Sequence, residues 1–147
     1  MNNIKFEELK GLVPLRVLTQ DHLIAFEMDN GNLIVMHHEQ DCCEDVSVED
    51  ISGDIQKLCG NEILFAQESS YQGGDDYRSE TWTFYKLGSI QGWIDIRWHG
   101  ISNGCYSERV SIIKVTKKEM KDLNFYSSIE GEQAMKWLAD SFEHQDD

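Results

Sequence analysis

The chain has 147 residues, of which 27 are acidic and 13 are lysine or arginine, so its formal net charge at pH 7 is −14. Such a charge repels nucleic acids and anionic membranes, and we expect neither as a direct partner. Hydrophobic residues make up 40% of the chain, which excludes a disordered protein.

No apolar run approaches the roughly 20 residues that a membrane helix needs, and the N-terminus lacks the basic start and apolar stretch of a signal peptide. We therefore expect one globular domain, residues 1–147, in the cytoplasm.

The N-terminal part of the chain is predicted to contain a short helix, a strand and a hairpin. The segment Phe6–Gly11 has the length of a short helix that ends at a glycine, and Leu15–Leu18 begins a strand. Between His22 and His38 two apolar runs flank the pair Asn30-Gly31. Asn-Gly tolerates the positive φ angles of a type I′ turn, so this segment predicts a β-hairpin.

The middle of the chain mixes a helical turn, a strand and a polar segment. Asp54 is placed to cap a helical turn that ends at Gly60, and a strand is predicted over Glu62–Gln67. The next residues, Glu68–Tyr77, are polar and rich in glycine. We expect them to form an exposed, mobile loop, which is a candidate binding edge.

Three further strands and a helix are predicted after this loop. The strands cover Thr81–Leu87, Gly92–His99 and about Cys105–Val115, with an Asn-Gly turn at Gly100–Gly104 between the last two. The helix covers about residues 129–144. Its start has capping-box spacing, and its apolar residues recur with helical periodicity at Ala134, Met135, Leu138 and Phe142.

Together these elements predict an α+β fold. A β-meander over about residues 15–115 forms an antiparallel, strongly bent sheet of about six or seven strands, and the C-terminal helix packs on it.

The acidic residues gather in two places, between residues 39 and 54 and at the C-terminus. A run of like charges is often only a solvated surface. The alternative is a surface that imitates a phosphate backbone or binds a basic groove of another protein. The acidic residues of this candidate patch, here called the acidic segment, are Glu39, Asp41, Glu44, Asp45, Glu49, Asp50 and Asp54.

The nearest approach to a metal site is His38 with Cys42 and Cys43. Structural zinc usually binds paired ligand motifs with short spacers, and no second pair accompanies these residues. We therefore expect no metal or other cofactor, and if a metal is present, these are its ligands. The irregular cysteine spacing predicts reduced thiols, and the adjacent Cys42 and Cys43 are not expected to bridge each other. The nearby acids also disfavour a cysteine nucleophile.

A second candidate site is the outward face of the strand over residues 92–99, where aromatic and basic residues alternate with core residues. An arginine beside aromatic rings suits a nucleotide or a protein hot spot. The alternative is that the arginine forms a surface ion pair and that the aromatic residues belong to the core. The residues of this ligand-binding alternative are Trp93, Arg97, His99, Arg109 and Tyr85.

Several motifs follow one another along the chain. They are Asp41-Cys42-Cys43-Glu44, Gly53-Asp54, Glu80-Thr81-Trp82-Thr83-Phe84-Tyr85-Lys86, Ile96-Arg97-Trp98-His99-Gly100, and Ser102-Asn103-Gly104 followed by Tyr106-Ser107-Glu108. Their order resembles a family of small phage proteins and proteins of bacterial mobile elements. The resemblance covers about Leu18–Ile112 and implies a mostly β fold and a phage or prophage setting, but no activity, since the family is a domain of unknown function.

In that setting we expect a non-enzymatic, acidic inhibitor in the bacterial cytoplasm. It would bind a basic surface on a host defence or nucleic-acid-handling protein, such as a CRISPR effector, a restriction enzyme or the transcription machinery, and it could act as a DNA mimic. One alternative is a sponge for a small signalling nucleotide, built at the interface of a homo-oligomer. A second alternative is a zinc-binding module or zinc-dependent hydrolase.

Overall fold

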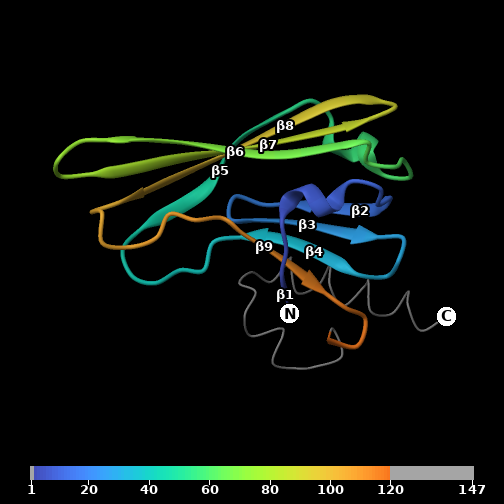
Figure 1. Ribbon diagram of the computed structural model, residues 1–147, viewed down its shortest axis with the longest axis horizontal. Coiled ribbons are helices and arrows are strands. Elements are labelled where there is room, and N and C mark those ends of the chain that lie inside the picture. Colours follow the sequence, from blue (N-terminus) through green and yellow to red (C-terminus); the bar gives the residue numbers. More distant parts are fainter. Residues whose placement is uncertain (1, 120–147) are drawn as a thin grey trace.

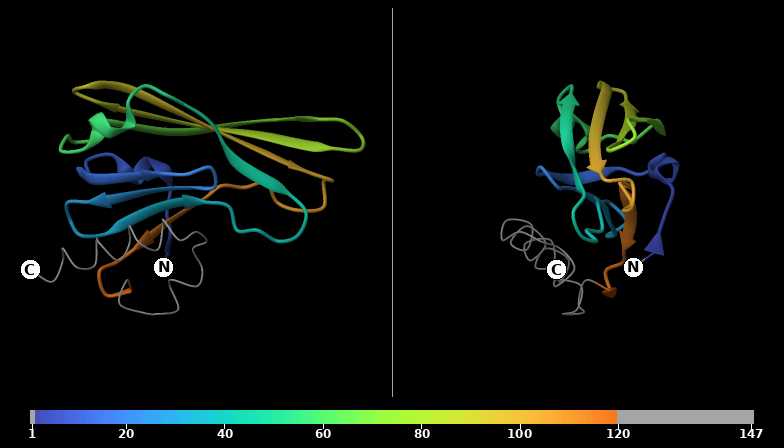
Figure 2. Two further views of the ribbon diagram at one scale, coloured as in Figure 1. Left: turned by 180° about the vertical axis from the view of Figure 1, so that it is seen from behind. Right: turned by 90° about the vertical axis from the view of Figure 1, so that its left-hand side faces the viewer.

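The structure is a computed structural model, and it describes residues 2–119. These residues form mostly antiparallel β-sheet, arranged as one sheet of five strands and one of four (Figure 1). The two sheets lie one above the other, as the two turned views in Figure 2 also show. We call the five-stranded sheet A and the four-stranded sheet B.

Sheet A combines the N-terminal strands with the last strand of the described chain. Its order is β1-β9-β4-β3-β2, and each neighbouring pair is antiparallel. The strands are β1 (Asn2–Asn3), β2 (Pro14–Thr19), β3 (Leu23–Met28), β4 (Leu33–His37) and β9 (Ser111–Val115).

Sheet B is formed by the middle of the chain. Its order is β5-β8-β7-β6, and again each neighbouring pair is antiparallel. Strand β5 enters from sheet A, and β6, β7 and β8 follow as a meander. The strands are β5 (Asp45–Ser52), β6 (Phe65–Gly74), β7 (Ser79–Ser89) and β8 (Gly92–Ser102).

The main core takes alternate side chains from the strands of both sheets. In β3 and β4 the intervening side chains are buried as well and form a second cluster with Val115. In β8, Ile94, Ile96 and Trp98 are buried, whereas the residues between them are more exposed. Phe26 and Ile34 of sheet A belong to the same buried cluster. One face of sheet B is therefore core, and the opposite face, which we call the outer face, points away from it.

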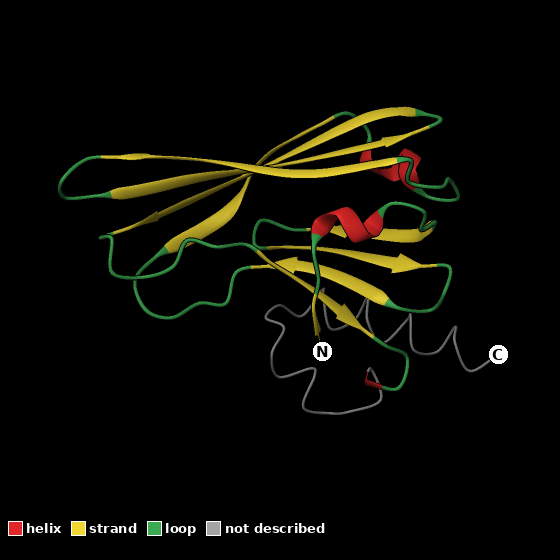
Figure 3. Ribbon diagram, viewed as in Figure 1, coloured by secondary structure: helices red, strands yellow, loops and turns green. Residues whose placement is uncertain are grey.

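The predicted α+β fold with one bent sheet of six or seven strands is wrong. The described residues contain two sheets and no α-helix; their helical segments are the 3-10 helices η1 (Phe6–Leu9) and η2 (Ile55–Leu58) (Figure 3). The additional strands are β1 and β5, which were not predicted because their apolar alternation is short or interrupted. The helix predicted at about 129–144 lies outside the described residues.

Two predicted helical turns are present, but as 3-10 helices. The carboxylate of Asp54 accepts a 3.1 Å hydrogen bond from the backbone N–H of Gln56, which confirms the predicted cap at the start of η2. No helix in the described residues has the length and apolar composition needed to cross a membrane.

The hairpin predicted around Asn30-Gly31 is confirmed as β3 and β4, but its turn is not type I′. Among the described residues only glycines have positive φ, and Gly31 has φ 86°, so Asn30 does not adopt the required angle. The Gly31 N–H donates to the Met28 carbonyl, and the Met28 N–H donates to the Asn32 carbonyl, each at 2.9 Å. This is a three-residue loop in which glycine takes the left-handed position.

The predicted mobile loop at Glu68–Tyr77 is largely strand. Strand β6 runs through Gly74 and pairs with β7 residue by residue, and the Asp75 N–H donates a 2.8 Å hydrogen bond to the Arg78 carbonyl at the turn. The two strands form a long hairpin whose tip extends beyond sheet A (Figure 1). This part of the strand was not predicted, because its serine, glutamine and glycine residues do not favour strand by themselves, whereas the pairing with β7 is set by the tight turn.

Candidate functional site

The outer face of sheet B is built by the alternation of side chains along β7 and β8. Residues directly opposite each other in an antiparallel pair point to the same side of the sheet. Trp82 pairs with His99, and Phe84 pairs with Arg97. The structure therefore gathers aromatic and basic side chains from both strands on this face.

The outer face carries a group of aromatic side chains that the core does not use. Tyr71 is 64% exposed and Trp93 is 56% exposed. The Trp82 ring lies 6.0 Å from that of Tyr71 and 5.1 Å from that of His99, and the Phe65 and Trp93 rings are 5.3 Å apart. The aromatic residues of the outer face are Phe65, Tyr71, Trp82, Phe84 and Trp93.

Each basic side chain of the outer face lies near a carboxylate or an aromatic ring that partly compensates its charge. Arg97 Nη2 lies 3.2 Å from Glu49 Oε1. The ammonium group of Lys86 lies 4.9 Å from the centre of the Trp93 ring, a cation–π contact. His99 Nε2 is 3.8 Å from a Glu80 carboxylate oxygen. The face is thus a mixture of aromatic rings and charge pairs rather than a cluster of unpaired cations.

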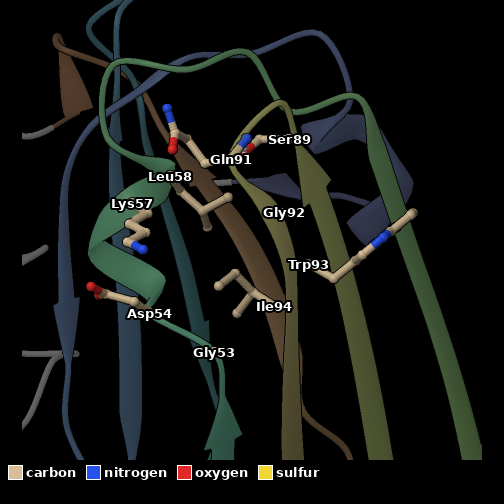
Figure 4. A pocket seen from close by; sticks show the side chains of 9 residues that line it. All are labelled: Gly53, Asp54, Lys57, Leu58, Ser89, Gln91, Gly92, Trp93 and Ile94. Carbon is tan, nitrogen blue, oxygen red and sulfur yellow. Dashed lines mark hydrogen bonds between the residues drawn. The ribbon is translucent and has the colours of Figure 1, made fainter.

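A hollow lies on this face between all the strands of sheet B. Its volume is about 450 Å³, and Arg97, Phe84 and Asp50 line it together with Gln67. A smaller pocket of about 220 Å³ lies beside the β7–β8 turn, between η2 and β8 (Figure 4). Both hollows have mixed polar and apolar walls, which suits side chains of a partner more than a buried small molecule.

The acidic segment lies along one edge of sheet B, because it leads into β5 and continues through it. Asp45, Glu49 and Asp50 belong to β5, the edge strand next to β8, and are exposed. Asp54 follows the strand, whereas Glu39 and Asp41 precede it, and these residues are exposed as well.

Glu44 is the exception in the acidic segment, because its side chain is buried. The Glu44 carboxylate accepts hydrogen bonds from the backbone N–H groups of Asp41 and Cys42, at 2.9 and 3.0 Å. Burial alone raises the pKa of this carboxyl, but these backbone donors outweigh burial and hold the pKa below its ordinary value. Glu44 therefore orders its own loop and is not a contact residue for a partner.

The predicted ligand-binding set is divided between the two faces of sheet B. Trp93, Arg97 and His99 lie on the outer face, as the alternation of β8 requires. Tyr85 is 1% exposed and lies in the core, where its ring packs 4.6 Å from that of Phe6. Arg109 lines a polar pocket of about 470 Å³ that also includes inward-facing residues of β6 and β7. These residues do not form one site.

Tyr85 was misplaced because the sequence alone does not show which alternate set of residues in β7 faces outward. Strands β7 and β8 extend through Ser89 and Gly92, which pair with each other across the two-residue turn Ile90-Gln91. This two-residue turn fixes the register so that Phe84, not Tyr85, lies opposite Arg97.

The predicted metal ligands are not arranged as a metal site. The sulfur atoms of Cys42 and Cys43 lie at bonding distance as a disulfide between neighbours, so the prediction that they do not bridge is wrong; Cys59 and Cys105 are free. His38 Nδ1 lies 2.7 Å from the Arg109 carbonyl. Across residues 2–119, no three side chains of His, Cys, Asp or Glu are grouped so that they can hold a metal ion.

Several residues of the outer face were not identified from the sequence. Phe65 lay in a predicted strand but was not assigned to a face, and Tyr71 lay in the segment expected to be a loop. Trp82, Phe84 and Lys86 were not distinguished from the core residues between them. The alternation in the run from Trp82 to Lys86 was the available signal, since only one set of alternate residues can face the core.

The model of one protein family matches most of the chain. It is described as "Domain of unknown function (DUF7448)", and it covers residues 4–112. These residues include all of sheet B with its outer face, and strands β2, β3 and β4 of sheet A. No match was found among curated proteins or among solved structures.

Proposed function

Because the chain belongs to the DUF7448 family, whose function is unknown, we propose its role from its own surface: a non-enzymatic inhibitor that binds another protein through the outer face of sheet B and the acidic edge at β5. The target in this proposal is a basic surface on a host defence or nucleic-acid-handling protein.

The observation that supports the proposal is the combination of exposed aromatic rings with an acidic strand on one open sheet. Interface centres are enriched in tryptophan, tyrosine and arginine, and charged groups at the rim set orientation and partner choice. Here Trp93, Tyr71 and Arg97 lie on the face, and the exposed acids of β5 lie at its edge. A partner surface with positive charge and shallow apolar pockets complements both parts.

The net charge of −14 also favours a positively charged protein as partner, because it attracts such a protein at long range. Opposite charges steer encounter and accelerate association, and the effect falls as salt screens them. A nucleic acid carries the wrong sign for this protein. If the acids replace phosphates on the target, the protein competes with DNA or RNA and acts as a DNA mimic.

The setting that we propose is a phage or prophage protein acting in the bacterial cytoplasm. Its target classes are CRISPR effectors, restriction enzymes and the transcription machinery, because each has a basic groove that holds nucleic acid. The inhibitor needs no cofactor and no membrane in this scheme, since occupation of the groove is sufficient.

The alternatives draw less support from the arrangement of residues. A nucleotide sponge requires cations gathered in one pocket, but Arg97 and Arg109 lie on different sides of sheet B, and Arg97 is paired with Glu49. A zinc module requires free thiolates, whereas Cys42 and Cys43 are joined to each other.

The test is a binding assay against a panel of purified proteins from those target classes, each with and without its nucleic acid. We expect at least one protein to bind, with affinity that falls as salt rises and with competition by its nucleic acid. Salt-insensitive binding, or binding alongside the nucleic acid, contradicts mimicry; no binding across the panel contradicts the proposed targets.

Two matched pairs of variants test the surface once a target is found. Trp93→Ala should weaken binding by about thirtyfold, the effect of losing a hot spot of about 2 kcal/mol. Ile90→Ala is its control, because Ile90 is an exposed apolar residue at the β7–β8 turn. Asp50→Lys should weaken binding more than Glu62→Lys, which reverses an exposed acid outside sheet B.

A further inference from the structure

Within residues 2–119, the two sheets have four edge strands, and three of them carry features that prevent pairing with another chain. Strand β1 has only two residues. Strand β2 begins with Pro14, has an irregular register between Pro14 and Arg16, and its Val17 carbonyl accepts a hydrogen bond from Gln56 at 3.1 Å. Strand β5 has a register shift between Val48 and Asp50 and several exposed acids.

Strand β6 lacks these devices over most of its length. It is exposed at nearly every position, has no proline, keeps an unbroken register with β7 and contains a single charged residue, Glu68. Long, regular and weakly charged edges are templates for strand pairing. Within the described residues, no strand lies on the side of β6 that faces away from β7.

The contact between Glu68 and Glu7 shows which backbone groups point outward. The Glu68 N–H donates a 2.8 Å hydrogen bond to the Glu7 carboxylate on η1, so it does not bond to β7. Because backbone groups alternate sides along an antiparallel strand, the N–H and C=O groups of Ser70 and Gln72 also point away from β7. η1 therefore covers the start of this edge, and the stretch after Glu68 stays open.

We propose that this open stretch of β6 pairs with the same stretch of a second copy, in antiparallel orientation about a two-fold axis at Tyr71. Ser70 of each copy then exchanges backbone hydrogen bonds with Gln72 of the other. The two four-stranded sheets become one eight-stranded sheet. The protected β5 edges prevent further addition, so assembly stops at the dimer.

This register agrees with the side chains and charges of β6. Tyr71 lies opposite Tyr71 of the second copy as a non-hydrogen-bonded pair, the arrangement in which cross-strand side chains are closest. Both Tyr71 rings point to the outer face beside Trp82, so the aromatic surfaces of the copies become continuous. Glu68 lies opposite Gly74 of the second copy, and no like charges face each other across the strands.

The first test measures association by sedimentation velocity over a wide range of protein concentration. We expect a monomer–dimer equilibrium without larger species. Gln72→Pro removes an outward N–H, which the β6–β7 ladder does not use, and should weaken the dimer at least tenfold, because each dimer loses two donors. Gln72→Ala keeps the N–H and should retain the dimer. A monomer at every concentration, or equal dimerisation of wild type and Gln72→Pro, overturns the proposal.

The second test fixes the register with single cysteines. Tyr71→Cys places two cysteines on the axis with their Cα atoms about 4.5 Å apart, close enough for a disulfide. Ser69→Cys is the matched control on the same face, since its two copies are separated by about 13 Å along the strands. Oxidation should give covalent dimer with Tyr71→Cys well above the level of Ser69→Cys and wild type. Equal cross-linking overturns the register.

Salt separates this inference from the proposed function. Two copies that each carry −14 repel, so added salt should tighten the dimer, whereas it should weaken binding to a basic target. The dimer is measured without any target protein. A missing target therefore leaves the dimer result intact, and a monomer leaves the target assay intact.

Discussion

The hydroxyl group of Ser102 on β8 donates a 2.5 Å hydrogen bond to the buried carboxylate of Glu108, which lies between β8 and β9. Thr81 on β7 donates a second hydrogen bond to the same carboxylate at 2.7 Å. Burial alone raises the pKa of this carboxyl, but the hydroxyl donors hold the pKa of Glu108 below its ordinary value of 4.5. Glu108 thereby connects the segment that follows β8 to β7 and β8, the two central strands of sheet B.

Ser102→Ala should lower the free energy of unfolding at pH 7 by about 1–3 kcal/mol, because a buried carboxylate loses a donor. A carboxyl with a lowered folded pKa stabilises the fold above the ordinary value of 4.5, and this contribution is lost as pH falls through the folded pKa. The difference between variant and wild type should therefore shrink in acid. Urea unfolding at neutral and acidic pH measures it, with the exposed Ser69→Ala as control; an equal difference at both pH values contradicts the role of Glu108.

Gly100→Ala should destabilise the fold by about 1–3 kcal/mol, the usual cost of overpacking. A Cβ atom at Gly100 would lie 2.8 Å from Glu108 Cβ and 3.2 Å from a Val46 methyl carbon. These atoms belong to the backbone-proximal part of buried residues and have little freedom to move. Thermal unfolding by circular dichroism measures the effect. An unchanged melting temperature would contradict the prediction and show that the backbone around Glu108 can move to make room for the methyl group.

Tyr85→Phe should leave the protein as stable as wild type or more stable at neutral pH. The Tyr85 hydroxyl is buried beside the Glu68 carboxylate but makes no hydrogen bond of normal geometry to a described group, so its removal relieves a desolvation cost of about 1–3 kcal/mol. Burial, with the carboxylate of Glu68 nearby, raises the pKa of Tyr85. Since the fold favours the protonated phenol, wild type should lose stability as pH rises above the ordinary value of 10, and Tyr85→Phe should lose less.

Chemical unfolding of wild type and Tyr85→Phe at pH 7 and above pH 10 tests this prediction. A clear loss of stability in Tyr85→Phe at pH 7 would mean that the hydroxyl has a partner that stabilises the core. Tyr71→Phe is the matched control, because the Tyr71 ring is 64% exposed.

Native mass spectrometry of protein purified without chelator should show the mass of the polypeptide, as monomer and dimer, without a stoichiometric adduct. A basic protein target is the only ligand in the proposed function, and the outer face offers paired rather than free cations. An adduct of nucleotide size would favour the sponge instead, and one that fits zinc would favour a metal site.

Hydrophobic alternation located most of the strands, because residues such as Ile94, Ile96 and Trp98 must share one face when they are buried. It did not locate the second sheet, since the division into sheets depends on which strands pair at long range. Nor did it find the long β6, because Ser69 and Ser70 gain strand conformation from pairing with β7 and not from their own propensity.

The candidate site was predicted only in part. Trp93, Arg97 and His99 were correctly placed on one face, because alternation within a single strand is readable without knowing its neighbours. The residues that β7 contributes to this face could not be predicted, since a register shift of one residue would place Tyr85 instead of Phe84 opposite Arg97. Glu44 looked like a surface acid because its burial depends on hydrogen bonds within its own loop.

Strand β7 assigns its alternate positions to different tasks. Thr83, Tyr85 and Leu87 are buried, while Phe84 and Lys86 between them are exposed. Substitutions at the exposed positions can therefore change the outer face without repacking the interior. If the outer face binds a partner as proposed, its specificity can change while the scaffold stays the same.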